Sequence, residues 1–475
     1  MPVLINTAKK PPQMAASAPA PILVSEILSA LSFALDLTEG QPMGHSVRSC
    51  VLGMRIAQEI GVPLEAQSDL YYALLMKDAG CSTNASRLFQ IIGTDEIRAK
   101  RDVKTTDWTK LGWESLQYAL SHVRTNSGLL ERIRALFDVA VNQKALDKEL
   151  VQIRCERGAS IARKMGLSES TALAIHSLDE HWNGKGNPDG LKGEEIPLFA
   201  RIANLAQTLD VFYTAAGPLA AVETAVRRSG RWFDPSLVGA VESLANRNAL
   251  FAAIEDANWL VIGLEPHSKS LPADEATLEN ICEAFADVID AKTPFTYRHS
   301  TGVAGAAVGM AETLSMKKSE VALIRRAALL HDIGKLSVPN TILEKPGKLD
   351  DAEWEVVKKH PYYSAEILKR IPGFQEVTEM AAAHHEKLDG SGYFRKLHAE
   401  QLSLPTRILV IADIYDALSA KRPYRDALSM EKVFQIMDKD APHALDANCL
   451  EALKNFQSHA SPASSELSQL SKNIQ

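Results

Sequence analysis

One set of motifs occurs twice in this chain, and the repetition constrains the fold more than any other feature. Residues Leu178–Phe212 align without gaps to His384–Leu418, at a constant separation of 206 residues. Further upstream, GHSV around His45 matches RHST around His299, and LMKDAGC matches LLHDIGK, both 254 residues apart. Such self-similarity predicts one supersecondary unit built twice. The shared residues include Glu180 and Glu386, Gly184 and Gly390, Gly186 and Gly392, Arg201 and Arg407, and Asp210 and Asp416.

The two separations differ, which implies an insertion of about 48 residues in the first copy, within residues 82–150. With 475 residues, the chain exceeds the usual size of a single core, so two domains are expected. We expect a first domain over 22–243 and a second over 275–457. Between them, the Gly, Pro and Ser punctuation of 244–274 indicates a linker. The Ala- and Pro-rich start, 1–21, and the Ser-rich end, 458–475, are typical of mobile tails.

Apolar residues recur at helical spacing in both copies, whereas strand-like alternation is scarce. Apolar residues make up 46% of the chain, charged residues 23% and aromatic residues 6%, a balance typical of globular helical proteins. We therefore predict an all-α fold made of two tandem helical domains. The net charge of −7 argues against binding of long nucleic acid. The five scattered cysteines and the absence of a long apolar run predict a soluble, cytoplasmic protein without a membrane span.

The second copy concentrates side chains that bind metals. They are His299, the adjacent pair His331 and Asp332, His360, the adjacent pair His384 and His385, and Asp413. Seven ligands are too many for one tetrahedral zinc ion, and mixed imidazole and carboxylate suits first-row transition metals such as iron or manganese. A lone histidine would more often be structural, but this density favours two ions that share an aspartate. Such a pair supports hydrolysis of a phosphoester.

The second copy resembles the HD-GYP branch of the HD-domain phosphohydrolases. The resemblance rests on HDIGK at His331–Lys335, HHEKLDGSGY at His384–Tyr393 and IADIYDALSAKRPYR at Ile411–Arg425. It implies two HD-type domains, the first degenerate, and an enzyme that cleaves a cyclic dinucleotide to the linear dinucleotide or to mononucleotides. Cyclic di-GMP is the substrate that the resemblance favours, with 3',3'-cyclic GMP-AMP as the alternative. A receptor or scaffold with weak catalysis is the alternative of another class.

The resemblance also implies roles for individual residues. Asp332 would bridge the two ions, one completed by His299, His331 and Asp413 and the other by His360, His384 and His385. Lys335, Arg422 and Arg425 would face the phosphates, with Asp332 and Lys335 as catalytic residues. Asp416, one turn after Asp413, would contact the substrate side by positioning the leaving oxygen or a water, or would instead cap a helix or pair with an arginine.

Some positions depart from the family pattern. Phe295 stands where a three-metal subset carries Glu, so two ions are expected rather than three. Gly302 replaces the Arg of the HSxRV motif, and Phe394 replaces the Pro of GYP. The loop after Phe394 reads KLHAEQLS, which leaves the substrate mouth and partnering with a diguanylate cyclase open.

The first copy lacks most of these ligands. The corresponding positions hold His45, Lys77, Asp78, Arg154, Leu178, Asp179 and Gln207. Lys and Arg would repel a dication, so this copy is expected to be catalytically inactive. It is a packing relic, a dimerisation platform through a face such as AAVETAVRRSG, or an effector site in which Lys77, Arg154 and Lys185 bind a nucleotide. A homodimer is therefore among the expected assemblies.

Overall fold

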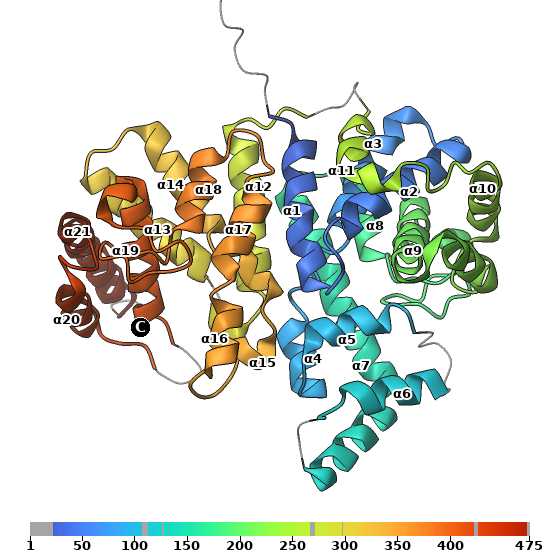
Figure 1. Ribbon diagram of the computed structural model, residues 1–475, viewed down its shortest axis with the longest axis horizontal. Coiled ribbons are helices and arrows are strands. Elements are labelled where there is room, and N and C mark those ends of the chain that lie inside the picture. Colours follow the sequence, from blue (N-terminus) through green and yellow to red (C-terminus); the bar gives the residue numbers. More distant parts are fainter. Residues whose placement is uncertain are drawn as a thin grey trace, which may run out of the picture.

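The regular structure of the protein is helical. The computed structural model describes residues 22–106, 113–125, 128–266, 271–296, 298–421 and 426–472. Within these ranges, β pairing is limited to isolated bridges, so the predicted all-α class is confirmed (Figure 1). No helix in these ranges is long and apolar enough to cross a membrane. The tail expected over 1–21 lies outside the described residues.

Two groups of helices lie side by side along the long axis of the molecule (Figure 1). The first half contains α1 (Val24–Thr38), α2 (His45–Glu59), α3 (Leu64–Met76), α4 (Ala85–Ile92), α5 (Glu96–Val103), α6 (Trp113–His122), α7 (Leu129–Lys164), α8 (Glu169–His176), α9 (Leu198–Arg228), α10 (Pro235–Asn246) and α11 (Ala257–Gly263). The second half contains α12 (Glu275–Asp290), α13 (His299–Thr313), α14 (Lys318–Leu330), α15 (Asn340–Leu343), α16 (Asp351–Val357), α17 (His360–Leu368), α18 (Gln375–Ala382), α19 (Leu404–Ser419), α20 (Met430–Asp440) and α21 (Ala447–Lys472).

The halves repeat the same helical frame. Helices α2 and α13 begin at the matched histidines, and α3 and α14 begin at matched positions 254 residues apart. Helices α8 and α18, and the starts of α9 and α19, correspond at a separation of 206 residues. The interval predicted to hold the insertion forms α4, α5, α6 and the first part of α7, which extend from one end of the first half (Figure 1). The second half has only the short α15 and α16 in the same place.

The interface between the halves is formed mainly by the first helix of each. Helix α1 packs against α17 and the 3₁₀ turn η5 (Ile333–Ser337), and α12 packs against α7. The buried Lys292 Nζ lies 2.8 Å from Glu96 Oε1, and Glu96 also accepts from the amide of Asn340. Buried apolar residues of both halves belong to one continuous core. The two halves therefore pack together as one unit rather than as independent domains.

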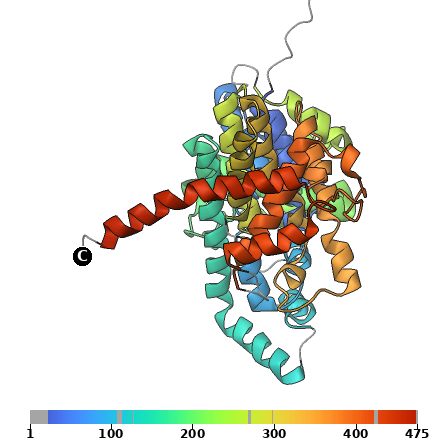
Figure 2. The ribbon, with the colours of Figure 1, turned by 90° about the vertical axis from the view of Figure 1, so that its left-hand side faces the viewer.

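The segments predicted as a linker and a C-terminal tail contain ordered helices. Within 244–274, helix α11 packs on α1 and α2, and Arg55 donates to the carbonyls of Leu250 and Ala252. This segment is thus part of the first half's surface. Helix α21 extends to Lys472, so most of 458–475 continues a helix that projects from the body (Figure 2).

Candidate metal centre

The structure brings all seven predicted ligands of the second half together at helix ends and turns. His299 and His360 begin helices, His331 caps the end of α14, and Asp332 precedes η5. His384 and His385 lie in the turn after α18, and Asp413 lies on α19. Helix α19 begins where Ser403 caps it and a proline occupies its first turn, both strong start signals. Apart from His385, which is partly exposed, these ligands are buried.

Asp332 lies between two groups of imidazoles. Its Oδ1 lies 3.3 Å from His360 Nε2 and 3.5 Å from His384 Nε2. Its Oδ2 lies 3.3 Å from His331 Nε2 and 3.4 Å from His299 Nε2. Each oxygen therefore faces a different group, which is the arrangement that a bridging carboxylate requires.

Asp413 spans the other side of the cluster. Its Oδ1 lies 3.3 Å from His299 Nε2 and 3.8 Å from His331 Nε2, while Oδ2 lies 3.7 Å from His385 Nδ1. The side-chain ligand atoms fall into overlapping sets whose members all lie within 4.8 Å of one another. A pair of neighbouring ions fits this distribution better than a single tetrahedral ion does.

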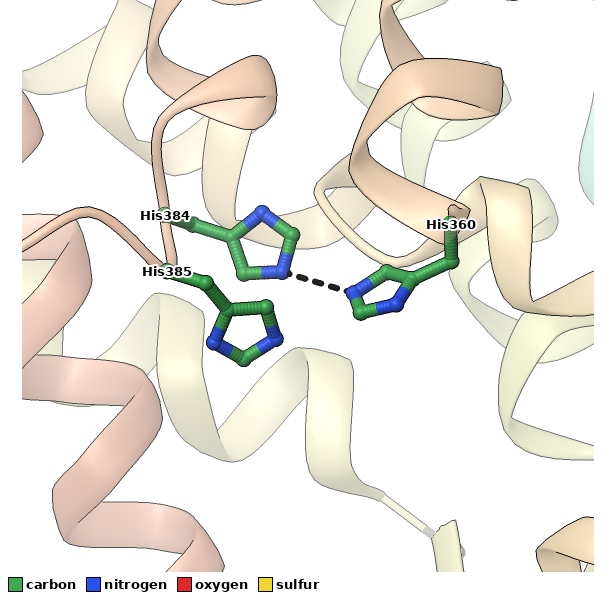
Figure 3. A group of neighbouring side chains, drawn as sticks. All are labelled: His360, His384 and His385. Atoms are coloured by element: carbon green, nitrogen blue, oxygen red, sulfur yellow. Dashed lines mark hydrogen bonds between the residues drawn. The ribbon is translucent and has the colours of Figure 1, made fainter. Parts of the chain in front are cut away.

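Backbone carbonyls fix the tautomers of three histidines. Nδ1 of His331, His360 and His384 lies 2.6–2.7 Å from the carbonyl oxygen of the residue three positions earlier. A carbonyl only accepts, so each Nδ1 donates and each Nε2 presents its lone pair to the centre. The Nε2 atoms of His360 and His384 lie 3.0 Å apart (Figure 3). Two imidazoles that bind one ion at about 2.1 Å, roughly at right angles, have this spacing.

The donor set fits a divalent transition metal on further grounds. His299 Nε2, His331 Nε2 and Asp332 Oδ1 are buried and have no hydrogen-bond partner among the described residues. Burial lowers the pKa of His360 to about 4, so its imidazole is neutral and able to coordinate. Burial opposes ionisation of Asp332, but the facing His331 and Lys335 hold its pKa well below the usual range. Burial opposes protonation of His331, but Asp332 and Asp413 raise its pKa to about 9, so a bound ion would take the place of a proton there. Imidazoles combined with ionised carboxylates form a ligand set for iron, manganese or similar ions.

Asp416 orients His299, and Gly302 makes room for it. Asp416 Oδ2 lies 2.6 Å from His299 Nδ1, so the carboxylate accepts from Nδ1 and turns Nε2 inward. A Cβ on Gly302 would lie 2.1 Å from Asp416 Oδ1. In the first half the equivalent Asp210 pairs with His45 and also with Arg48, at the position of Gly302. Loss of that arginine leaves Asp416 partly exposed at the centre.

Two further residues, missed by the sequence reasoning, support the centre. Ser364 Oγ accepts from the amide of Gly334 and donates to the carbonyl of His331, which fixes the loop that carries Asp332. A Cβ on Gly334 would lie 2.0 Å from the His360 carbonyl, so only glycine allows this approach. Ser364 lies one turn after His360, but no motif marks it.

Aromatic side chains line one side of the centre. Tyr393 stacks on His385, with ring centroids 4.7 Å apart, and Trp354 meets Tyr393 edge-on at 5.9 Å. Phe394, where the family pattern has proline, lies against Tyr362 at 6.0 Å. Trp354, Tyr362 and Phe394 are exposed. We call Trp354, Tyr362, His385, Tyr393 and Phe394 the aromatic rim. Its exposed ring faces suit stacking against bases.

The predicted phosphate-facing residues are placed only in part. Lys335 Nζ forms an ion pair with Asp332 Oδ2, and its side chain is 21% exposed, so it borders both the ligands and solvent. Asp416 lies against His299, as described above. Arg422 and Arg425 lie outside the described residues.

In the first half, cations of the chain occupy the equivalent centre. Lys77 pairs with Asp78, the counterpart of Asp332, and Arg154 pairs with Asp179. Glu39, Asp78 and Cys81 come close enough to hold an ion, but Lys104 lies 2.9 Å from Glu39 and burial raises the pKa of the Cys81 thiol well above its usual range.

A model of the HD domain matches residues 103–237 and 283–449 of the chain. The chain belongs to the HD domain family. Its HD-GYP-type motifs place it among the phosphodiesterases of this family, as the sequence predicted. The 3'3'-cGAMP-specific phosphodiesterase 3 of Vibrio cholerae is 44% identical over 91% of this chain and 94% of its own. A crystal structure of a cyclic GMP-AMP specific phosphodiesterase of V. cholerae has a TM-score of 0.65, with 40% identity, covering 92% of this chain and 98% of that one.

A relative with another substrate matches a smaller part. The cyclic di-GMP phosphodiesterase response regulator of Xanthomonas campestris pv. campestris is 38% identical over 30% of this chain and 39% of its own. The similarity to the Vibrio enzyme thus includes both helical halves of the protein. The match to the response regulator covers only 30% of the chain, which is less than the length of either half.

Proposed function

We propose that this protein hydrolyses a cyclic dinucleotide, and that the dinucleotide is 3',3'-cyclic GMP-AMP. The observation that carries the proposal is the similarity to the cyclic GMP-AMP phosphodiesterase of V. cholerae along 91% of the chain, through both halves. The HD-GYP motifs alone favoured cyclic di-GMP. The relative named for that substrate matches only 146 residues, so it supports the reaction more than the choice of base.

The second half would hold two divalent ions, iron or manganese, with Asp332 as the bridge. The two oxygens of Asp332 face different histidine pairs, and Asp413 faces the centre from the opposite side. The bound pair would supply activation of water for attack on phosphorus and would offset the charge that develops there. The first half would be a degenerate HD domain, because Lys77 and Arg154 already neutralise the carboxylates of its centre.

The chain's own side chains would position the dinucleotide. Lys335, partly exposed beside Asp332, is placed to bind a phosphate oxygen, and Asp416 holds the proton of His299 Nδ1 and fixes that ring. The purine bases would stack on Trp354 and Phe394 of the aromatic rim. Arg422 and Arg425 are proposed as further phosphate contacts from their motif alone.

The test is a substrate competition with purified, full-length protein loaded anaerobically with iron or manganese. We expect a higher kcat/KM for 3',3'-cyclic GMP-AMP than for cyclic di-GMP, with the linear dinucleotide detected by chromatography. Metal analysis should give two ions per chain. Equal or higher kcat/KM with cyclic di-GMP would contradict the choice of substrate while leaving the reaction class intact.

The competing function is a receptor that binds the dinucleotide without cleaving it. Single-turnover assays with enzyme in excess separate the two, because a receptor shows saturable binding and no linear product. A matched variant, Asp332→Asn, should bind the substrate but not convert it if the protein is an enzyme.

A further inference from the structure

A cavity of about 520 Å³ lies in the first half, away from the metal centre. One end reaches Arg154, Asp179 and Gln207, which occupy the positions of His360, His385 and Asp413 in the second half. The cavity extends from this end along α7, beside the inserted helices α4, α5 and α6. Cavities of this volume commonly hold small organic ligands.

Apolar side chains of the insertion form the walls. Helix α7 contributes Leu136, Val139, Leu150 and Val151, and α4 contributes Leu88 and other aliphatic residues. From Leu136 to Arg154, the helix rises by about 27 Å at 1.5 Å per residue, so the walls are long relative to a nucleotide base. The same walls also include polar side chains, among them Gln143 and Asp147 of α7.

Basic side chains line the end of the cavity at Arg154. Lys100, Lys104 and Arg154 lie there beside the carboxylates of Glu39 and Asp179. Lys104 and Lys100 hold the pKa of Glu39 well below its usual range despite its burial, so this carboxylate stays ionised. An anionic head at this end would face Lys100, Lys104 and Arg154.

Buried polar atoms at the same end lack partners. Gln207 Oε1 and Arg154 Nε have no hydrogen-bond partner among the described residues, and the Gln207 residue is 9% exposed. Both side chains line the cavity. Because an unpaired buried donor is unfavourable, Arg154 Nε points to an acceptor, such as a carboxylate, at the end of the cavity. Gln207 Oε1 is an acceptor and would need a donor such as a water molecule.

We propose that this cavity binds a single-chain amphiphile with an anionic head, of the chemistry of a long-chain fatty acid. The head lies at Arg154 and Lys104, and the chain lies between α4 and α7. The expected nucleotide effector fits less well, because most of the wall is aliphatic and Lys185 does not line the cavity.

The first experiment measures binding of oleate to delipidated, full-length protein by calorimetry, with native mass spectrometry for stoichiometry. We expect one oleate per chain. Val151→Trp fills the cavity and should weaken binding at least about tenfold. Val141→Trp is the matched control, because Val141 lies on the same helix, is 65% exposed and does not line the cavity. A thermal unfolding midpoint close to that of the wild type shows that both variants fold.

The second experiment separates the head from the chain. Lys104→Met should weaken oleate about tenfold or more and leave oleyl alcohol unchanged, since only oleate carries the charge. Glu39 keeps Lys100 as its partner in this variant, and Lys148→Met, at an exposed position of α7, is the control. Absence of saturable oleate binding, or equal binding by Val151→Trp, would overturn the proposal. The proposal would also be overturned if the wild-type protein bound a cyclic dinucleotide and the Val151→Trp variant did not.

Discussion

The two halves of the molecule share a frame and differ in what fills its centre. A buried His–Asp pair closes both, with His45 Nδ1 2.7 Å from Asp210 and His299 Nδ1 2.6 Å from Asp416. Around Asp332 the second half places imidazoles whose Nε2 lone pairs face inward, whereas the first half pairs Asp78 with a lysine. The frame therefore tolerates either filling. Buried carboxylates only need a positive partner, which an ammonium group or a bound ion supplies.

The retained residues are those that hold the backbone. Glu386 accepts from the amides of the loop that follows it, and Glu180 does the same in the first half. A Cβ on Gly392 or Gly186 would lie within 2.6 Å of backbone atoms. These residues were matched in sequence because the loop geometry needs them, whether or not catalysis does.

The test with the largest expected effect replaces each of the two matched aspartates, Asp332 and Asp78, by asparagine. Asp332→Asn should lower kcat/KM by about 10³-fold or more and reduce the metal content, because an amide cannot bridge two ions. Asp78→Asn should keep kcat/KM within roughly twofold of the wild type, since Asp78 pairs with Lys77 in the half that we propose to be catalytically inactive. Steady-state kinetics and metal analysis are the measurements. Comparable losses in both variants would show that the first half takes part in the reaction.

A second test addresses how firmly the halves are joined. Glu96→Gln leaves Lys292 buried without its carboxylate, so the free energy of unfolding should fall by about 3 kcal/mol. Glu149→Gln, which breaks a partly exposed pair with Arg87, should cost less than about 1 kcal/mol. Urea unfolding measures both. A Glu96→Gln protein as stable as the control would mean that apolar packing of α1 and α12 suffices.

A third test restores to the second half the arginine that the first half keeps. Gly302→Arg should lower kcat/KM by about tenfold, because its Cβ would displace Asp416 Oδ1. Asp416 Oδ2 should keep its hydrogen bond from His299 Nδ1, since the first half retains the equivalent pair of His45 and Asp210 beside Arg48. Gly305→Arg lies on the same helix, where a Cβ meets no atom within 4 Å, and should have little effect. A loss of about 100-fold or more with Gly302→Arg would show that the arginine separates Asp416 from His299, unlike the equivalent pair of the first half.

The sequence predicted the helical class and the cluster because repeated motifs report local geometry. A His-Asp pair at the end of one helix and a His-His pair after another can be read as ligands without knowing the distance between them. The packing of α1 against η5 of the other half could not be predicted from the sequence, because an apolar helix face does not specify which helix it packs against. The Ser-rich composition of 458–475 predicted a tail but did not indicate that α21 continues through it to Lys472.

The cavity shows the same limit more clearly. The change in separation located the insertion in the sequence. The walls of the cavity, however, form only when α4 to α7 pack beside the first half's counterpart of the metal centre. Lys77, Arg154 and Lys185 were grouped by charge alone. The structure pairs Lys77 with Asp78 and leaves Lys185 exposed outside the cavity, because separation along the chain does not set distance in space.

The smallest expected effect concerns the aromatic rim. Trp354→Ala should raise KM about tenfold, since stacking of one base is worth roughly 1–3 kcal/mol. Trp259→Ala, an 81% exposed tryptophan on α11 of the first half, should leave KM unchanged. Because any purine offers a face to stack on, the rise should be similar for 3',3'-cyclic GMP-AMP and cyclic di-GMP. If KM rose for only one of the two dinucleotides, Trp354 would contribute to the choice of base. The aromatic rim would then provide a selectivity that stacking alone does not explain.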